Sequence, residues 1–439
     1  MRRGACPTLA TPMQTGDGLL VRLRPVRSGF ALSEIVTLAS AARRFGNGIL
    51  EVTARGNLQI RGLVPETVPA LAAVIADADI DITDGVAIET PPLAGMDPAE
   101  IINPLPLALQ IRAAIAGHRP ALLLAPKLSI IIDGGGGLHL DQTSADIRLR
   151  AFRVGSDVLW LLGIAGTEKT AERIAVLPAA DVVPAVLLIL AELARRGRDA
   201  RGRDLDGGML ARVLGSTEGL QVISSREPAP LPAGIHDCGG NGPVLGLALA
   251  FGQTDVESLL ALADRLERLG VHEIRLAPGH ALLVPGLKHG DVPETQAFAR
   301  TLGFLISPDD PGNHIAACAG MGACASALLD TKAVARLFID TAPEVLDGSL
   351  AVHLSGCAKG CARPSAATLT MLGAPLGYGL VVNGPASAAP NAYIEQKTIK
   401  TAVVRLGALV RDNKHAGESA RSCLTRLGTD VVIAAVQQG

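Results

Sequence analysis

Aromatic side chains are scarce in this chain of 439 residues, where one tryptophan, two tyrosines and seven phenylalanines make up 2 % of the sequence. Hydrophobic residues as a whole reach 48 %, so the cores have to be packed from leucine, valine, isoleucine and alanine. Long apolar runs are missing as well: the best candidate, 182–191, contains Pro184 and ends before Glu192. It is too short to span a bilayer, so we predict a buried helix there and no membrane partner.

An excess of positive charge is also lacking, because 40 lysines and arginines face 42 aspartates and glutamates. A protein that binds nucleic acid would show a basic surplus or stripe, so we expect no nucleic-acid partner. Arg2 and Arg3 are not followed by an apolar segment, which predicts no secretory signal. Seven cysteines are an odd count, which favours a reducing cytoplasm and metal chemistry over a disulfide framework.

Four of the cysteines form two close pairs. Cys318 and Cys324 are separated by five residues, and Cys357 and Cys361 by three. Structural zinc sites usually bring their cysteines in tighter and more even pairs. The wider and unequal spacing, with glycines beside both pairs, favours a [4Fe–4S] cluster held by four thiolates. Buried structural cysteines are the alternative.

The chain repeats itself: Ile35 aligns with Leu259, 224 residues further on. Both copies have apolar residues at helical spacing. These are Ile35, Leu38, Ala42 and Phe45 in the first copy and Leu259, Leu262, Leu266 and Leu269 in the second. The first copy predicts a strand at 19–23, a helix at 33–45 and a strand at 49–60, with Ser33 and its counterpart Asp255 as helix N-caps.

The second strands of the two copies differ in character. The first carries Arg55, Asn57, Gln59 and Arg61, which become Gly279, Ala281, Leu283 and Pro285 in the second. Alternation along a strand puts the side chains of each set on one face. A polar and cationic face in one copy alone favours an anionic ligand there. The solvated face of an amphipathic strand is the alternative.

The two copies divide the chain into four parts of an α+β fold. We expect half-domains at 10–85 and 240–300, and longer α/β segments at 88–230 and 308–439, of which the second carries the cysteine pairs. Half-units of this kind usually pack together to complete one layer. The proline- and glycine-rich stretch 227–246 predicts the linker between the halves.

These patterns resemble the sulfite and nitrite reductase superfamily. The resemblance rests on the two cysteine pairs with Thr331-Lys332 between them, on Arg22-Leu-Arg24-Pro25, and on Thr53-Ala-Arg55 followed by Gln59. It covers nearly the whole chain. It implies a duplicated architecture in which two ferredoxin-like half-domains pair and two α/β domains accompany them, the second holding an iron–sulfur cluster.

Departures from that pattern narrow the resemblance. Siroheme reductases usually read Cys-Pro-Asn-Gly-Cys at the last pair, whereas this chain reads Cys357-Ala-Lys-Gly-Cys361, and Lys127 stands alone where they have two lysines. The chain is most similar to the precorrin-3B synthase family, monooxygenases of aerobic cobalamin biosynthesis. That resemblance implies a [4Fe–4S] cluster, a mononuclear non-haem iron, and hydroxylation of precorrin-3A at C20 with closure of a γ-lactone, using O2 and reducing equivalents. A siroheme- and ferredoxin-dependent sulfite or nitrite reductase is the alternative.

A polyacidic tetrapyrrole calls for guanidinium groups, which bind carboxylates with two hydrogen bonds each. The residues that we expect at this substrate are cationic or polar. They are Arg22, Arg24, Arg55, Asn57, Gln59, Arg61 and Lys127. A structural use of one or two of them is the alternative. By the same resemblance, Cys361 faces the bound tetrapyrrole.

Activation of O2 normally needs a metal with an open position, and non-haem iron oxygenases commonly bind it with two histidines and one carboxylate. His139 and Asp141 are candidates, because we predict a strand there whose alternation puts both on one face. A surface turn near 134–137 is the alternative interpretation, and His314 and His353 near the cysteines are further candidates. The sequence names no catalytic acid or base.

The electron source has no motif of its own. The chain has no Gly-x-Gly-x-x-Gly between a predicted strand and a helix, and the glycine run 134–137 predicts a hairpin turn between two strands. We therefore expect NADH as the ultimate donor, acting through a separate reductase or ferredoxin that docks near the cluster. An electron-transfer iron–sulfur protein and a zinc-stabilised binding module are the rival functions.

Overall fold

The structure, a computed structural model, describes residues 7–215, 226–363 and 365–437. Its central part contains a five-stranded and a six-stranded sheet, one for each copy of the repeat. The first has the order β1 (Met13–Thr15), β2 (Gly18–Leu23), β5 (Leu58–Leu63), β4 (Ile49–Val52) and β13 (Gln253–Asp255). The second has the order β11 (Gly234–Asp237), β12 (Pro243–Leu249), β15 (Ala281–Val284), β14 (Glu273–Ala277) and β3 (Gly29–Ala31), with β16 (Phe304–Leu305) beside β12.

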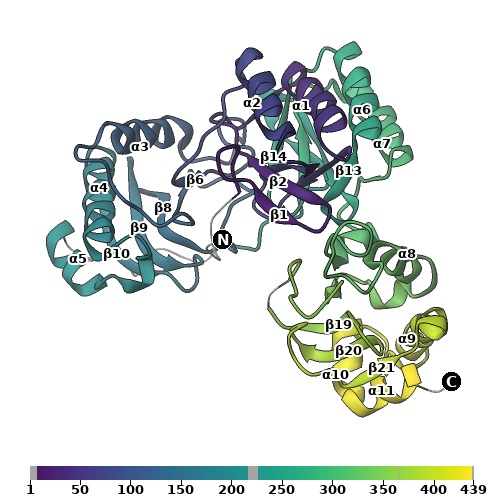
Figure 1. Ribbon diagram of the computed structural model, residues 1–439. Helices are drawn as coiled ribbons and strands as arrows, with labels where there is room; N and C mark the ends of the chain where they lie inside the picture. The colour runs from purple at the N-terminus through teal and green to yellow at the C-terminus, as the bar shows by residue number, and fades with distance from the viewer. Residues whose placement is uncertain (1–6, 216–225, 364, 438–439) are drawn as a thin grey trace.

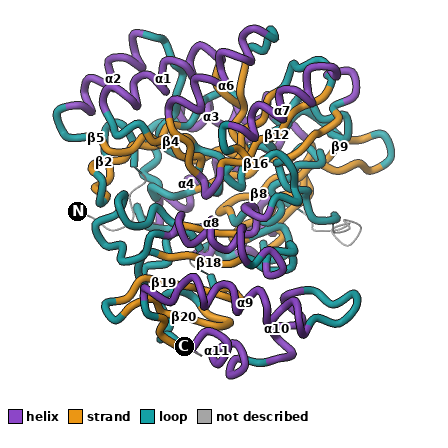
Figure 2. The backbone as a smooth tube through the Cα atoms, turned by 90° about the vertical axis from the view of Figure 1, so that its right-hand side faces the viewer, coloured by secondary structure: helices purple, strands orange, loops and turns teal. Residues whose placement is uncertain are grey.

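Each copy gives a short edge strand to the sheet of the other, because β13 pairs with β4 and β3 pairs with β14. The helices α1 (Leu32–Phe45), α2 (Thr67–Asp77), α6 (Val256–Arg268) and α7 (Val292–Thr301) cover one side of these strands (Figures 1 and 2). Apolar side chains from both copies merge into one core, in which Leu38 and Leu262 are fully buried. The exchanged strands and the shared core make the two half-domains one unit.

The two α/β regions share a second common plan. The first contains β6 (Ala87–Glu89), β7 (Ser129–Asp133), β8 (Ala145–Val154), β9 (Asp157–Gly166) and β10 (Glu172–Pro178), with α3 (Leu105–Gly117), α4 (Ala179–Arg196) and α5 (Gly207–Leu214). The second contains β17 (Ile315–Ala317), β18 (Val352–Ser355), β19 (Ala367–Ala374), β20 (Gly377–Gly384) and β21 (Ala392–Ile394), with α8 (Thr331–Thr341), α9 (Ile399–Asn413), α10 (Ala420–Leu427) and α11 (Thr429–Gln437). Each sheet has three parallel strands followed by two antiparallel ones, so the duplication extends beyond the half-domains.

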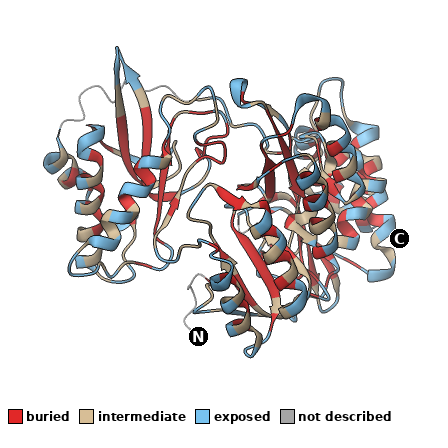
Figure 3. Ribbon diagram, turned by 90° about the horizontal axis from the view of Figure 1, so that it is seen from above, coloured by how far each residue is buried: buried red, intermediate tan, exposed pale blue. Residues whose placement is uncertain are grey.

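Helix α4 contains the apolar stretch 182–191, and the prediction of a buried helix there is confirmed. Val182, Ile189 and Leu190 are fully buried in the core of the first α/β region. Figure 3 shows strands that are mostly buried and helices that are exposed on their outer sides. Within the described residues, every helix is too short or too polar to cross a membrane.

The first copy differs from its prediction at 49–60, which is a hairpin and not one strand. β4 and β5 are antiparallel, and in the turn between them Gly56 has a φ of 72°. A left-handed backbone of this kind favours glycine, which the sequence supplies. Arg55 therefore lies in the turn, whereas Gln59 and Arg61 lie on β5.

The predicted helix caps were right in one copy. In α6, Asp255 accepts a hydrogen bond from the Ser258 N–H (2.8 Å), as predicted. In α1 the helix begins at Leu32, one residue before the predicted cap Ser33. The side chain of Glu34 takes over the capping, because it accepts the N–H of the residue before the helix (2.7 Å).

Two connections also differ from their predictions. The predicted linker 227–246 includes β11 and the start of β12, so only its first part is a connection. The glycine run 134–137 is not a hairpin turn, because β7 and β8 are parallel. Parallel neighbours need a longer connection than a hairpin provides. The loop after β7 therefore continues to 144 and contains His139 and Asp141.

Candidate functional site

The two cysteine loops start from neighbouring strands. β17 ends directly before Cys318 and β18 ends two residues before Cys357, and these strands are parallel. The carboxyl ends of parallel strands lie at the same edge of a sheet, so both loops begin there. The Cys318 N–H donates to the Leu354 carbonyl (3.2 Å), and the Gly356 N–H donates to the Cys318 thiol (3.1 Å). The loops are thus in direct contact.

Gly356 allows this close approach, because a Cβ at its position would lie 2.6 Å from the Ala327 Cβ. Cys361 completes the set: burial and the thiols of the other three cysteines raise its pKa. Thiolates gathered in this way repel one another, and a bound positive centre relieves the repulsion. The structure therefore brings the two loops that carry the four predicted cysteines together.

The donor set is compatible with an iron–sulfur cluster. In a cubane each of four thiolates binds a different iron. The two cysteine loops supply four such donors from one edge of the sheet. Within 7–215, 226–363 and 365–437, no three His, Cys, Asp or Glu side chains stand close enough to hold one ion.

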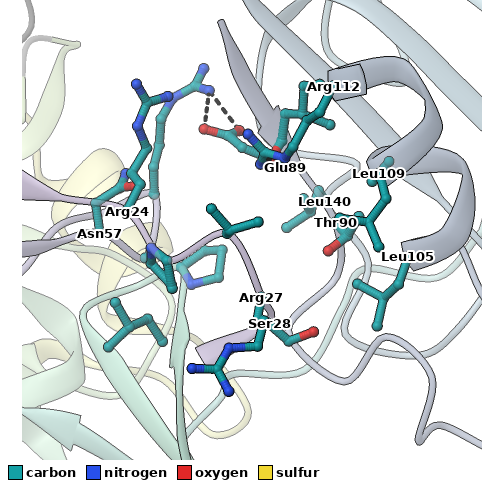
Figure 4. A pocket seen from close by; sticks show the side chains of 18 of the residues that line it. Arg24, Arg27, Ser28, Asn57, Glu89, Thr90, Leu105, Leu109, Arg112 and Leu140 are labelled. Atoms are coloured by element: carbon teal, nitrogen blue, oxygen red, sulfur yellow. Dashed lines mark hydrogen bonds and ion pairs between the residues drawn. The ribbon is translucent and has the colours of Figure 1, made fainter. Parts of the chain in front are cut away.

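A cationic cleft lies between the first half-domain and the first α/β region. Two cavities, of about 220 and 300 Å³, share Arg24, Arg55, Asn57 and Glu89 in their walls and so form one cleft. Its cations come from segments far apart in the sequence. They are Arg22, Arg24, Arg27, Arg55, Arg112, Lys127 and Arg201. Figure 4 shows Arg24, Arg27 and Arg112 around the first cavity, with Glu89 between them.

Arg55 has a carboxylate partner inside the cleft. Its Nη1 lies 2.7 and 2.9 Å from the two carboxylate oxygens of Glu89, and its Nη2 donates to the Ser144 carbonyl. The Arg55 side chain is still 38 % exposed. An ion pair of this exposure contributes about 0–1 kcal/mol, so an incoming carboxylate can replace Glu89 at little cost.

Arg112 and Arg24 are held by uncharged oxygen atoms. Arg112 donates to the Ile88 carbonyl (3.0 Å) and to the Thr83 hydroxyl (3.2 Å), and Arg24 donates to the Gly85 carbonyl (3.0 Å). Burial and the nearby Arg24 lower the pKa of Arg112. Cations that gather in a half-buried cleft create a positive potential, which favours an anionic ligand.

Gln59 and Arg61 lie outside the lining of both cavities. The side-chain amide of Gln59 has partners for both its atoms in one orientation. Its nitrogen then donates a hydrogen bond to Glu51 (2.8 Å), and its oxygen accepts one from Arg22 (2.9 Å). Arg61 is buried and bonds to Asp17 (2.7 Å) and Glu51 (3.2 Å). Both side chains bond to protein groups next to the cleft, and their contact with a ligand stays a prediction.

Comparison with known proteins identifies the architecture. A family model described as the nitrite/sulfite reductase ferredoxin-like half domain matches residues 11–78. A precorrin-3B synthase from Sinorhizobium sp is 52 % identical over 443 residues, which cover 100 % of this chain and 95 % of that protein. The chain belongs to the precorrin-3B synthase family. This confirms the resemblance found in the sequence.

More distant relatives connect the precorrin-3B synthase family to its superfamily. A ferredoxin–nitrite reductase from Synechococcus elongatus is 27 % identical over 82 % of this chain and 77 % of that protein. The solved structure of the NirA protein of Mycobacterium tuberculosis matches 94 % of this chain and 84 % of that chain, with a TM-score of 0.69 and 19 % identity. The structural match bears on the fold alone, and it confirms the predicted α+β architecture of the sulfite and nitrite reductase kind.

The mononuclear iron implied for precorrin-3B synthases finds no preassembled site at the predicted pair. His139 and Asp141 lie in a loop and not on a strand, although their side chains are 3.4 Å apart. Asp141 forms an ion pair with Arg226 (2.5 Å), and the His139 Nε2 lies 2.9 Å from the Glu227 carbonyl oxygen. Both side chains would have to leave these partners to bind iron, so this geometry favours a structural network.

The two histidines near the cysteines both have a lowered pKa. Burial and the nearby Arg363 lower the pKa of His353 to about 4. Neither of its ring nitrogens has a hydrogen-bond partner among the described residues. Burial also lowers the pKa of His314. His353 has two nitrogens that could bind a metal, but the described residues supply no second and third ligand beside it.

The sequence analysis missed several residues of the cleft, among them Arg27, Glu89, Arg112 and Arg201. A signal existed for Arg112, which is the sole charged residue of the otherwise apolar α3. A lone cation on a helix with a buried face calls for a polar partner or ligand. The other three residues belong to short strands and loops. No motif or periodic pattern in the sequence indicates that they face the cleft.

Proposed function

We propose that this chain is a monooxygenase that converts precorrin-3A to precorrin-3B in aerobic cobalamin biosynthesis. One atom of O2 enters the substrate as a hydroxyl group at C20. The other atom leaves as water, for which an external donor supplies two electrons and two protons. The ring A acetate closes a γ-lactone, which adds no further atom. The product is therefore heavier than the substrate by one oxygen atom.

The observation that carries this proposal is the connection between the cationic cleft and the cysteine loops. A continuous set of polar contacts runs from Arg22 in the cleft wall through Gln59, Glu51 and Arg61 to the carbonyl of Ala323, next to Cys324. An enzyme that transfers electrons to chemistry on a polyacidic substrate needs both features in one place. The identity to a precorrin-3B synthase over the whole chain supports the same reaction.

The acetate and propionate arms of the substrate would be bound by the cations of the cleft. Arg24 and Arg112 already donate to uncharged oxygens and retain charge for an anion. Arg55 would exchange Glu89 for a substrate carboxylate, because its fork suits bidentate binding. Leu105 and Leu109 of α3 line the same cavity and would pack against the apolar part of the macrocycle.

Cys318, Cys324, Cys357 and Cys361 would hold a [4Fe–4S] cluster. When bound, the cluster would supply single electrons and a non-haem iron would supply an open position for O2. The residues of the chain do the remaining work: they fix the carboxylates of the substrate and keep its reacting carbon in a partly apolar cavity. Orientation of this kind lowers the entropy cost of the reaction.

We further propose that electrons come from a separate reductase or ferredoxin, with NADH as their ultimate source. Relatives in the superfamily are named ferredoxin–nitrite reductases, which supports a ferredoxin-type donor. Cys361 is exposed, so a partner could approach the cluster at that loop. The described cysteines are free, which fits the reducing cytoplasm as the place of action.

The test is a single turnover with labelled oxygen. Anaerobically reduced protein is mixed with precorrin-3A, ¹⁸O2 is admitted, and the product is analysed by mass spectrometry. We expect one added oxygen atom that carries the label. An unlabelled oxygen would contradict a monooxygenase. Siroheme absorption in the purified protein, together with sulfite or nitrite reduction, would support the alternative function instead.

A further inference from the structure

The turn between β1 and β2 lies against the loop that carries Cys324. The turn comprises 15–18, in the first half of the chain. A Cβ added to Gly16 would overlap the main chain at Cys324 and Ala325. Any larger residue would therefore move one of the two segments. The contact joins the first half of the chain to the cysteine-bearing half.

Asp17, the next residue of the turn, holds a guanidinium against the same loop. The Arg61 Nη2 lies 2.7 Å from one carboxylate oxygen of Asp17, and the Nε lies 2.9 Å from the other. The same Nη2 donates to the carbonyl of Ala323 (3.1 Å), the residue before Cys324. The Thr15 hydroxyl donates to Asp17 (2.8 Å) and fixes the carboxylate.

This ion pair is buried and stays charged. The side chains of Arg61 and Asp17 are 7 % and 6 % exposed. Burial by itself would raise the pKa of Asp17 and lower that of Arg61, but their mutual hydrogen bonds outweigh it, so the pKa of Asp17 is lowered and that of Arg61 is raised. Met321 and Gly322 of the cysteine loop are exposed, whereas Ala323, which Arg61 contacts, is buried. Contacts from the hairpin are therefore a main anchor of the loop.

We propose that the turn 15–18 and Arg61 form a seat that holds the Cys318–Cys324 loop in the geometry that binds the cluster. The inference rests on the proposed function in that it assumes the [4Fe–4S] cluster. Arg61 acts through the loop and lines neither cavity, so it is a positioning residue. The cysteine site of the second half is incomplete without the hairpin of the first.

The seat is also connected to the cleft. Glu51 accepts hydrogen bonds from Arg61 (3.2 Å) and from Gln59 (2.8 Å), and Gln59 accepts from Arg22 in the cleft wall. Gln253, on the strand donated by the second copy, also donates to Glu51. One network therefore fixes the cysteine loop relative to the cations that would bind the substrate.

Arg61→Lys tests the seat, with Arg275→Lys as the matched control. Arg275 is 8 % exposed, pairs with Glu273 (2.8 Å) and donates to the Ala94 carbonyl of another segment (2.9 Å). In protein freed of iron, we expect iodoacetamide to alkylate Cys324 about ten-fold faster in Arg61→Lys than in wild type or control, because a charge-assisted hydrogen bond to its loop is lost. In reconstituted protein, a chelator should remove iron from Arg61→Lys faster by about the same factor.

Gly16→Ala tests the seat by sterics alone, with Gly290→Ala as its control. A Cβ at Gly290 would meet no atom within 4 Å, and its backbone φ is not left-handed. We expect Gly16→Ala to displace the loop, so that Cys324 is alkylated faster and less iron and sulfide is retained per chain. Gly290→Ala should retain the wild-type amounts. Circular dichroism checks that each variant keeps its fold.

Two negative results would have different meanings. If alkylation of Cys324 and loss of iron are the same in wild type, Arg61→Lys and Gly16→Ala, the seat is refuted and the proposed cluster is unaffected. If wild-type protein takes up no iron and sulfide under anaerobic reconstitution, the proposed cluster is refuted. The alkylation rates of the iron-free variants then decide separately whether the hairpin orders the loop.

Discussion

The two halves of the chain share one plan and differ in chemistry. The first half-domain borders a cleft with Arg24, Arg27 and Arg55 in its wall. In the second half-domain, the residues that correspond to these three arginines are Ala248, Phe251 and Gly279. They line a cavity of about 190 Å³ against the second α/β region. Duplication thus produced two equivalent cavities: the first has several arginines in its lining, and the second has one, Arg363.

The α/β regions show the opposite difference, because only the second carries the cysteine loops on its parallel strands. In the proposed function the first half binds the substrate and the second half delivers electrons. The seat formed by 15–18 and Arg61 is where the two roles meet. This division makes a clear prediction. Substitutions in the first half should weaken substrate binding and leave the cluster intact, and substitutions in the second half should do the reverse.

Loss of a cysteine should have the largest effect. Cys357→Ala and Cys361→Ala each remove a ligand, so we expect no stable cluster and a fall in turnover of about a thousand-fold or more, equivalent to ~4 kcal/mol. Iron and sulfide analysis measures the first effect, and product formation the second. Precorrin-3A should still bind anaerobically with wild-type affinity, because its cations belong to the first half. A variant that keeps its cluster would contradict the assignment of the ligands.

Arg55→Ala should produce the reverse pattern. A lost hydrogen bond between charged groups corresponds to about a 10- to 100-fold loss of affinity for precorrin-3A. The cluster should remain, and the melting temperature should change little, since the Arg55 side chain is 38 % exposed. Arg43→Ala is the control, because Arg43 pairs with Glu257 on the surface of the same layer. If melting falls by many degrees and affinity is unchanged, Arg55 is structural.

A reciprocal exchange tests the two copies at one position of the repeat. Leu283 is fully buried among apolar side chains, so Leu283→Gln leaves a buried amide without partners and should cost about 1–3 kcal/mol of unfolding free energy. Gln59→Leu should change stability less, but it removes a support of Arg22 and should weaken substrate binding several-fold. Denaturant titration and binding measurements separate the two effects. Equal losses of stability in both variants would show that the copies do not differ in role.

The smallest predicted effect is a pH dependence in the first half. Burial, and next the nearby Asp97 and Asp133, raise the pKa of Glu100 to about 7, although a hydrogen bond from the Gly95 N–H opposes the shift. A carboxyl group whose pKa is raised on folding stabilises the fold below its ordinary pKa, and this stabilisation is lost as the pH rises through 7. Glu100→Gln should therefore raise the melting temperature at pH 8 and not at pH 4. The same gain at both pH values would contradict the shift.

The sequence was sufficient for features that depend on local spacing. The cysteine pairs were recognisable because their ligands lie on two short loops, each with its own glycines. The repeat was recognisable because the helices α1 and α6 keep the same apolar spacing. Arg55 was singled out because the second copy has no charge at the matching position, and Arg22 and Arg24 because of the resemblance to the superfamily.

Features that depend on distant partners were not predictable. The exchange of β3 and β13 between sheets involves pairings between residues more than 200 positions apart, which no local pattern encodes. Alternation along the strand predicts on which face the Arg61 side chain lies, but it does not predict which residue that side chain contacts. Its partner, Asp17, comes from another strand pair. For the iron candidates His139 and Asp141, the predicted strand was wrong, and the ion pair between Asp141 and the distant Arg226 was not predictable.

The most direct test of the account is electron paramagnetic resonance of the anaerobically reduced protein, with and without precorrin-3A. If the cations of the first half hold the substrate beside a cluster in the second half, wild-type protein gives an iron–sulfur signal that changes when the substrate is added. In Arg55→Ala the same signal is present and does not change at that substrate concentration. A reduced protein without an iron–sulfur signal, or a signal that bound substrate leaves unaltered, would contradict the central claim.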